Sequence, residues 1–129
     1  MSETLQGACL CGKVTFEVRE PKVMVTCHCT RCQRWTGTGA ATVVAVDAEN
    51  LTVTAGAELL KHFKEGEFAD RVFCSNCGSG LYTGGKTLYV AAGVLKNVAM
   101  KPAFHLQVAH KSPWDEIGDT APQYQEYTP

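Results

Sequence analysis

Alternating apolar and polar residues mark the clearest element in the first part of the chain. Val14, Phe16 and Val18 are apolar, the residues between them are polar, and the run ends at Pro21. A period of two is typical of a strand with one buried face, because successive side chains point to opposite sides of a sheet. We therefore expect a half-buried strand over residues 13–19.

Six further runs of apolar and β-branched residues predict strands. They cover residues 23–27, 41–46, 51–54, 71–74, 88–92 and 104–110. Most glycines fall between these runs, as is usual for turns. Residues 57–63 favour a short helix, although a strand also fits their sequence. With no internal repeat or linker, the pattern predicts one mainly β domain over residues 1–129, with antiparallel strands and one or two short helical turns.

Composition and charge narrow the function classes. The 129 residues carry a net charge of −1, and 45% of them are apolar, which is ordinary for a globular domain and favours neither nucleic acid nor membrane lipid. No apolar run approaches the ~20 residues needed to cross a bilayer, and the first residues lack the pattern of a secretory signal. We expect a cytoplasmic protein without a nucleic-acid or membrane partner. In that reducing compartment, seven cysteines favour metal binding over disulfides.

The cysteines fall into three clusters, of which the first and the last are pairs. Cys9 and Cys11 are two residues apart at the entrance to the first predicted strand, where such side chains share a face. Cys74 and Cys77 are separated by two residues and followed by glycine, which is typical of a turn that wraps around a metal ion. Together the pairs predict a closed site in which four thiolates bind one structural zinc ion. The alternatives are buried cysteines without a metal, or a redox dithiol at Cys74 and Cys77.

The middle cluster supplies three further sulfurs. Cys27 and Cys29 have the strand spacing, and Cys29 and Cys32 have the turn spacing, so that one short segment can present three thiolates to a second zinc ion. A fourth position open to water or substrate is typical of catalytic zinc. Joining the first pair to this cluster instead would leave the last pair without enough ligands. His28 should point away from its neighbours. In the alternative interpretation, a distant side chain closes the site, with three candidates: His62, His105 and His110.

Around these cysteines the chain resembles the glutathione-dependent formaldehyde-activating enzyme family, which also includes centromere protein V. Three segments carry the resemblance: GACLCGKV at residues 7–14, CHCTRCQRWTG at 27–37 and FCSNCGS at 73–79. The similarity continues into residues 93–95, 111–114 and 122–124. It implies the β-tent zinc fold, with Cys9, Cys11, Cys74 and Cys77 as structural ligands and Cys27, Cys29 and Cys32 as catalytic ones. The spacing of the cysteines predicts the same division.

The open site leads to a functional hypothesis. Zinc stabilises a bound thiolate, so a small thiol such as glutathione can add to an aldehyde, and the reverse step breaks the carbon–sulfur bond. In the alternative role, zinc polarises the carbonyl group of the aldehyde as a Lewis acid. We therefore predict a lyase that uses two zinc ions per chain and acts on thiol–aldehyde adducts such as S-hydroxymethylglutathione, with no catalytic residue beyond the open site. The alternatives are a non-catalytic zinc module that binds a protein partner, and a peptide-sulfoxide reductase, which would need a metal-free cysteine.

A few other residues carry expectations. Three cations could hold a substrate carboxylate, although each is also an ordinary surface residue: Arg31, Arg34 and Lys111. Trp35 follows the open site closely and could line its mouth or pack in the core. Trp114 is expected to anchor the tail by packing. His105 is expected to lie at the surface or to make ordinary hydrogen bonds rather than to act in catalysis.

Overall fold

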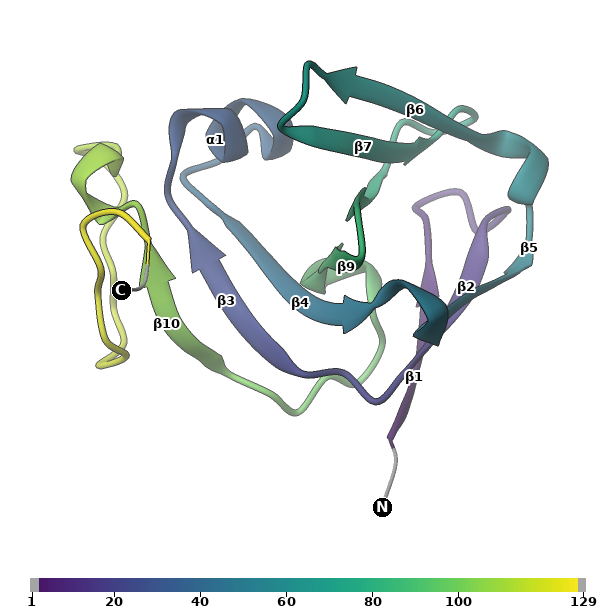
Figure 1. Ribbon diagram of the computed structural model, residues 1–129, viewed down its shortest axis with the longest axis horizontal. Helices are drawn as coiled ribbons and strands as arrows, with labels where there is room; N and C mark the ends of the chain where they lie inside the picture. Colours follow the sequence, from purple (N-terminus) through teal and green to yellow (C-terminus); the bar gives the residue numbers. More distant parts are fainter. Residues whose placement is uncertain (1–2, 128–129) are drawn as a thin grey trace.

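The computed structural model describes residues 3–127, which form two β-sheets (Figure 1). The smaller sheet is antiparallel and has the strand order β1-β2-β5. Its strands are β1 (Thr4–Ala8), β2 (Thr15–Arg19) and β5 (Leu51–Ala55).

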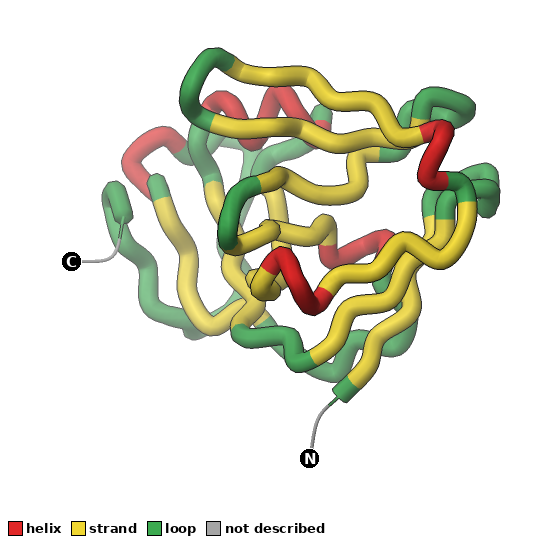
Figure 2. Tube along the Cα trace, turned by 45° about the vertical axis from the view of Figure 1, so that its right-hand side comes forward, coloured by secondary structure: helices red, strands yellow, loops and turns green. Residues whose placement is uncertain are grey.

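The larger sheet has the strand order β10-β3-β4-β9-β8-β7-β6. Neighbouring strands are antiparallel, except that β10 runs parallel to β3. Its strands are β3 (Val23–Cys27), β4 (Ala41–Asp47), β6 (Leu60–Glu65), β7 (Ala69–Cys74), β8 (Gly80–Gly84), β9 (Thr87–Ala91) and β10 (Pro102–Leu106). Figures 1 and 2 show that this sheet bends, so that the β6–β7 hairpin lies above β3 and β4 with α1 (Thr30–Thr36) beside it. The bend creates the space in which the pocket described below lies.

Short helical turns connect several strands. Besides α1, the described residues contain four 3-10 turns: η1 (Ala48–Asn50), η2 (Ala57–Leu59), η3 (Ala92–Val94) and η4 (Val108–His110). The prediction of a mainly β protein with little helix is therefore confirmed.

One hydrophobic cluster joins the two sheets. In β2, Phe16 and Val18 are buried while Glu17 is half-buried, as the alternation predicts. The largest fully buried side chains come from both sheets and from the segment before β2: Val14, Phe16, Val18, Val44, Val46, Val72, Leu81 and Val90. Cys9 and Cys74 belong to the same cluster. Two of the predicted metal ligands therefore lie in the hydrophobic core.

Most predicted strands are confirmed. The run over residues 23–27 matches β3, and five others end within two residues of the observed boundaries. The helix expected over residues 57–63 is wrong beyond its first turn, because η2 passes into β6, an edge strand whose residues are mostly exposed and lack alternation. The strand expected over 104–110 ends at Leu106, because Gln107 adopts a positive φ of 57° and η4 follows. Strands β1 and β8 and helix α1 were not predicted from the sequence.

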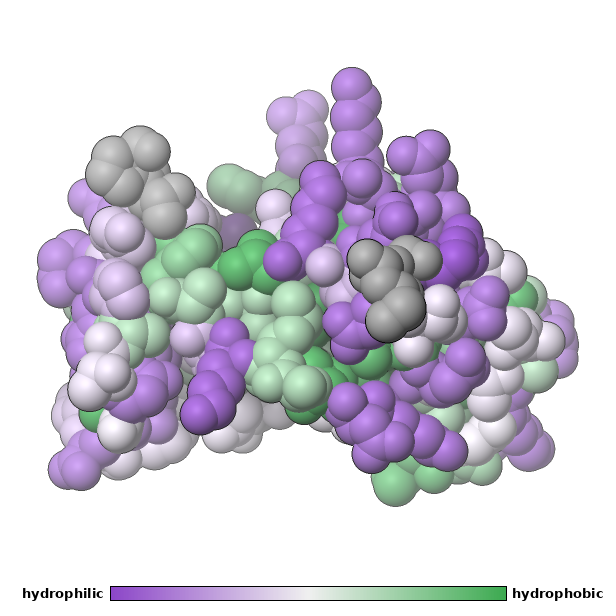
Figure 3. Space-filling model, turned by 90° about the horizontal axis from the view of Figure 1, so that it is seen from below, coloured by the Kyte–Doolittle hydropathy of each residue, from purple (hydrophilic) through white to green (hydrophobic). Residues whose placement is uncertain are grey.

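The face drawn in Figure 3 is mostly hydrophilic at its two sides, with apolar residues exposed in the middle. Trp114 is 69% exposed, so the expectation that it anchors the tail by packing is wrong. Within residues 3–127 we find no helix with the length and hydropathy of a membrane-spanning segment.

Candidate functional site

The sulfur atoms of Cys9, Cys11, Cys74 and Cys77, the four-sulfur cluster, all lie within 4.8 Å of one another. The Cys9 and Cys11 sulfurs are 3.5 Å apart, and the Cys11 and Cys74 sulfurs are 4.0 Å apart. In a tetrahedral site with zinc–sulfur bonds of about 2.3 Å, neighbouring sulfurs are about 3.8 Å apart. The four side chains therefore fit a zinc ion.

Two tight turns position this cluster. After β1, the Gly12 amide donates to the Cys9 carbonyl over 3.1 Å, and after β7, the Gly78 amide donates to the Cys74 carbonyl over 2.7 Å. Both glycines have φ near +80°, a conformation that other residues adopt at a cost. Cys9 and Cys11 thus lie in a turn between β1 and β2, and the expectation that they share the face of a strand is wrong. Their spacing suits a turn equally well.

Ser79 connects the two turns. Its hydroxyl oxygen accepts a hydrogen bond from the Leu10 amide over 2.9 Å and lies 3.2 Å from the Cys77 sulfur. The contact with Ser79 lowers the pKa of Cys77 to about 5, whereas desolvation by burial raises the pKa of Cys74. The surroundings of Cys77 therefore favour its thiolate form, whereas those of Cys74 favour its thiol form.

The sulfurs of Cys27, Cys29 and Cys32, the three-sulfur cluster, also lie within 4.8 Å of one another. Cys27 is the last residue of β3, Cys29 is the N-cap of α1, and Cys32 lies in the helix, where its amide donates to the Cys29 sulfur over 3.3 Å. Within residues 3–127, no fourth Cys, His, Asp or Glu donor atom joins this group, so His62, His105 and His110 lie elsewhere.

The three sulfurs influence one another strongly. Hydrogen bonds from the Cys27 and Cys32 thiols lower the pKa of Cys29 to about 2. The pKa of Cys27 is raised, chiefly by Cys29, and the pKa of Cys32 is raised by both neighbours. Three thiolates this close repel one another unless a cation lies among them. Sulfur donors crowded in this way fit a thiophilic divalent ion such as zinc.

His28 points away from the three-sulfur cluster, as predicted, and enters a buried hydrogen-bond chain. Its Nε2 lies 2.9 Å from His105 Nδ1, and His105 Nε2 lies 2.9 Å from Asp119 Oδ1. Because a carboxylate only accepts, His105 donates from Nε2 and accepts at Nδ1 from His28. His28 is 2% exposed and His105 4%, so His105 makes hydrogen bonds, as expected, but does not lie at the surface.

The backbone around His28 is also fixed. The His28 amide donates to the Leu106 carbonyl over 2.9 Å, and the Gln33 side-chain amide donates to the His28 carbonyl over 2.8 Å. The same Gln33 nitrogen donates to the His110 carbonyl over 3.0 Å, and Ser112 donates its hydroxyl to Gln33 Oε1 over 2.6 Å. The C-terminal segment therefore holds the short connection between β3 and α1, beside which the three cysteines lie.

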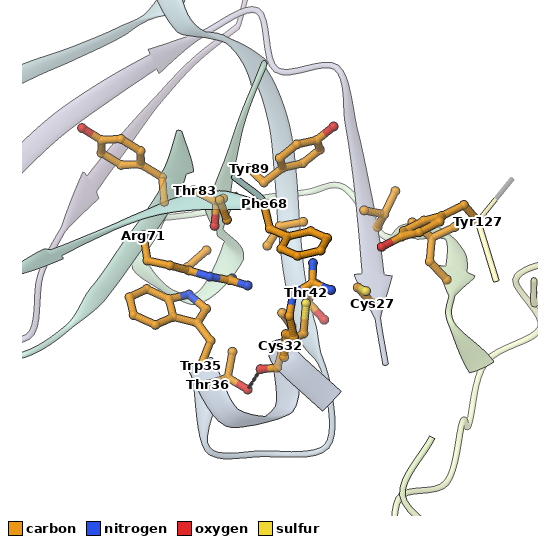
Figure 4. A pocket seen from close by; sticks show the side chains of 18 residues that line it. Cys27, Cys32, Trp35, Thr36, Thr42, Phe68, Arg71, Thr83, Tyr89 and Tyr127 are labelled. Atoms are coloured by element: carbon orange, nitrogen blue, oxygen red, sulfur yellow. Dashed lines mark hydrogen bonds between the residues drawn. The ribbon is translucent and has the colours of Figure 1, made fainter. Parts of the chain in front are cut away.

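A cavity of about 300 Å³, here called the cysteine pocket, opens beside Cys27 and Cys32 (Figure 4). Its walls come from α1, from β3, β4, β7, β8 and β9, and from Leu106 and Tyr127. Arg31 and Trp35 line it, as the sequence suggested. Arg34 lines a different hollow on the protein surface, and Lys111 donates to the backbone carbonyl of Asp115. Of the three candidate cations, only Arg31 lies at this pocket.

The sequence analysis missed several residues of the cysteine pocket. They are Phe68 at the tip of the β6–β7 hairpin, Arg71 on β7, Tyr82, Tyr89 and Tyr127. No local motif marks them, because strands that are far apart in sequence and, for Tyr127, the C-terminal segment bring them to the pocket. Although burial disfavours the charge of Arg31, the nearby Glu65 carboxylate raises its pKa. The pocket thus combines sulfur atoms, aromatic rings and two guanidinium groups.

Comparisons with known proteins agree with these features. Residues 4–110 match the model of the family described as glutathione-dependent formaldehyde-activating enzyme. A Schizosaccharomyces pombe protein described as an uncharacterized lyase is 32% identical over 89 residues, which are 65% of this chain and 62% of that protein. The match thus spans less than two thirds of the yeast protein. A crystal structure of a Rhodobacter sphaeroides protein has a TM-score of 0.60 and 26% identity, covering 72% of this chain and 89% of that one.

Proposed function

Because the chain belongs to the glutathione-dependent formaldehyde-activating enzyme family, we propose that it is a zinc-dependent carbon–sulfur lyase. The reaction is the reversible cleavage of a thiol–aldehyde adduct, R–S–CH₂–OH, into a free thiol and formaldehyde. The carbon–sulfur bond breaks, the hydroxyl oxygen becomes the carbonyl oxygen, and its proton is balanced by the proton gained by sulfur. S-hydroxymethylglutathione is the first adduct to test, because the family description joins glutathione and formaldehyde.

The observation that carries this proposal is the position of the three-sulfur cluster on the wall of a pocket. Cys27 and Cys32 line a cavity large enough for a small molecule, and the cluster has no fourth protein donor within residues 3–127. In this proposal Cys27, Cys29 and Cys32 hold a zinc ion, which would stabilise the sulfur of the substrate as a thiolate. The four-sulfur cluster holds a second, structural zinc ion.

In this proposal the other residues of the pocket exclude water and bind or position the substrate. Trp35 and the aromatic side chains opposite it reduce the access of water to the adduct, which strengthens electrostatic interactions within the pocket. Arg31, whose charge Glu65 stabilises, offers guanidinium hydrogens to an anionic part of the substrate. His28 and His105 act through the backbone, since their hydrogen-bond chain lies on the side of β3 away from the pocket and positions the connection between β3 and α1.

Exchange NMR tests the activity. NMR follows the exchange between formaldehyde, glutathione and their adduct, and the protein should increase the exchange rate between them. A Cys32→Ser variant should return exchange to the uncatalysed rate, whereas Arg34→Ala, which lies outside the cysteine pocket, should leave it unchanged. Exchange that the protein does not accelerate, for glutathione and for several other thiols, would refute the proposal. Metal analysis should find two zinc ions per chain.

A further inference from the structure

The charges beside the cysteine pocket form one connected group. Glu65, at the end of β6, lies 2.8 Å from Arg31 Nε through one carboxylate oxygen. Its other oxygen accepts from Arg71, over 2.8 Å from a terminal nitrogen and 3.2 Å from Nε. Two guanidinium groups thus share one carboxylate, so these three side chains together carry a net charge of about +1.

Aromatic rings hold these guanidinium groups in place. Arg31 lies over the Phe68 ring at 4.5 Å from its centre, and Arg71 lies over the Trp35 ring at 5.5 Å. The Arg71 side chain is only 8% exposed, and Figure 4 shows its guanidinium group directed toward the pocket above the Trp35 indole. Glu65 contacts Arg31 at the Nε atom of the guanidinium group, so the terminal N–H groups of Arg31 can still bind a carboxylate.

Much of the rest of the pocket offers apolar surface. Four aliphatic side chains of the larger sheet line one wall: Val25, Val43, Ala91 and Leu106. Among residues 3–127, no Asp or Glu lines the pocket, so an ammonium group placed there would lose its water without gaining a carboxylate partner. A second carboxylate on the same ligand would gain little, because the first carboxylate already neutralises the net positive charge of the Glu65–Arg31–Arg71 group.

We propose that the cysteine pocket selects thiol–aldehyde adducts with an apolar or aromatic body and a single carboxylate. The apolar body packs on the strands, and the carboxylate binds the guanidinium pair that Glu65 leaves half-neutralised. This inference rests on the proposed lyase function and narrows its substrate class. It makes glutathione, with two carboxylates and an ammonium group, a poorer ligand than a small apolar thiol acid.

Binding without a thiol tests the selectivity apart from catalysis. The chain has two tryptophans, so a Trp114→Phe background leaves Trp35, in the pocket wall, as the fluorescent reporter. The zinc-loaded protein is titrated with 3-phenylpropionate, 3-phenylpropylamine, phenylsuccinate and S-methylglutathione. We expect 3-phenylpropionate to bind roughly tenfold or more tightly than the other three, the effect of one charge-assisted hydrogen-bonded pair. Equal or tighter binding of the amine, the dicarboxylate or the glutathione derivative overturns the inference, as does the absence of binding by all four.

A charge substitution sharpens this test. Glu65→Gln removes the shared carboxylate and adds about one unit of positive charge, so phenylsuccinate should gain affinity and become at least as good a ligand as 3-phenylpropionate. Glu67→Gln, on the exposed hairpin turn two residues away, is the matched control and should keep the original order. An unchanged order in a folded Glu65→Gln protein contradicts the role of Glu65. If that variant does not fold, the ligand series on the unaltered pocket still decides the inference.

The exchange assay separates the two proposals. Formaldehyde exchange is compared for 2-mercapto-3-phenylpropionate, mercaptosuccinate and glutathione. Faster exchange with the first thiol supports both the function and the selectivity. Equal acceleration of all three retains the lyase and rejects the selectivity, whereas acceleration of none rejects the lyase and leaves the binding experiment to judge the pocket.

Discussion

The two cysteine clusters use the same ligand atom in different surroundings. The four-sulfur cluster joins turns that are 63 residues apart, and Cys9 and Cys74 belong to the hydrophobic core. The three-sulfur cluster comes from one segment of six residues, and one of its sides faces the cysteine pocket. An ion in the first cluster would close a long loop of the chain, whereas an ion in the second would close almost none.

This difference separates stability from chemistry. Closing a long loop restricts the unfolded chain, so a metal that does so couples its binding free energy to folding. A metal held by one short segment adds little to the order of the rest of the chain, and its free side can face a ligand. The difference predicts that a cysteine-to-serine substitution unfolds the protein when it is made in the four-sulfur cluster. In the three-sulfur cluster the same substitution should remove activity and leave the fold intact.

The largest effect is expected for Cys74→Ser. Structural zinc binding is worth roughly 10–16 kcal/mol in zinc-finger peptides, as much as the whole stability of a typical domain. The buried serine hydroxyl would also replace a ligand in the core. We expect the variant to be largely unfolded at 25 °C, as measured by circular dichroism and by the dispersion of amide NMR signals. A native-like spectrum from a protein with one zinc fewer would show that this cluster does not hold the fold together.

Cys29→Ser should remove activity and spare the fold. Serine is a good N-cap, so α1 can still begin at this position, and no long loop is opened. The expected result is one zinc per chain, thiol–formaldehyde exchange at the uncatalysed rate, and a melting temperature within a few degrees of the unaltered protein. Unfolding comparable to that of Cys74→Ser would remove the distinction between the clusters.

The sequence predicted the cysteine clusters better than it predicted the pocket. Short-range spacing separated the clusters because each cysteine turn is a local structure, and the strand over residues 23–27 was predicted because its apolar residues are consecutive and buried. The helix α1 was missed because it has no fully buried residue and hence no apolar stripe. Arg71 and Phe68 reach the pocket through the bend of the larger sheet, a long-range arrangement that no local pattern encodes.

A smaller effect is expected from the histidine chain that supports the three-sulfur cluster. His105→Ala would leave the buried Nε2 of His28 without its acceptor, which costs about 1–3 kcal/mol of unfolding free energy. His62→Ala, which removes an exposed contact with Asp70, should cost about 1 kcal/mol or less. Urea unfolding measures both. In addition, a chelator should remove zinc from the three-sulfur cluster faster in His105→Ala than in His62→Ala. Equal rates would mean that the histidine hydrogen-bond chain does not support this cluster.

The smallest expected effect is on how the free energy of unfolding depends on pH in the acidic range. The hydrogen bond from His105 holds the pKa of Asp119 below its usual value, so the carboxylate is more easily ionised in the folded chain than in the unfolded one. This contribution to stability is therefore present above the unfolded pKa of about 4 and is lost as the pH falls through the lower folded value. Asp119→Asn should be less stable than the unaltered protein at neutral pH, and the gap should narrow in acid.

Zinc–thiolate sites also lose metal in acid, so the informative quantity is the difference between two proteins at each pH, measured as the free energy of unfolding. Glu116→Gln removes a neighbouring exposed carboxylate. Its free energy of unfolding should differ little from that of the unaltered protein at every pH. If Asp119→Asn shows the same flat profile as Glu116→Gln, the carboxylate contributes nothing through His105. The connection between β3 and α1 would then be held by its other contacts, such as the hydrogen bonds from the Gln33 side chain to the His28 and His110 carbonyls, without help from this carboxylate.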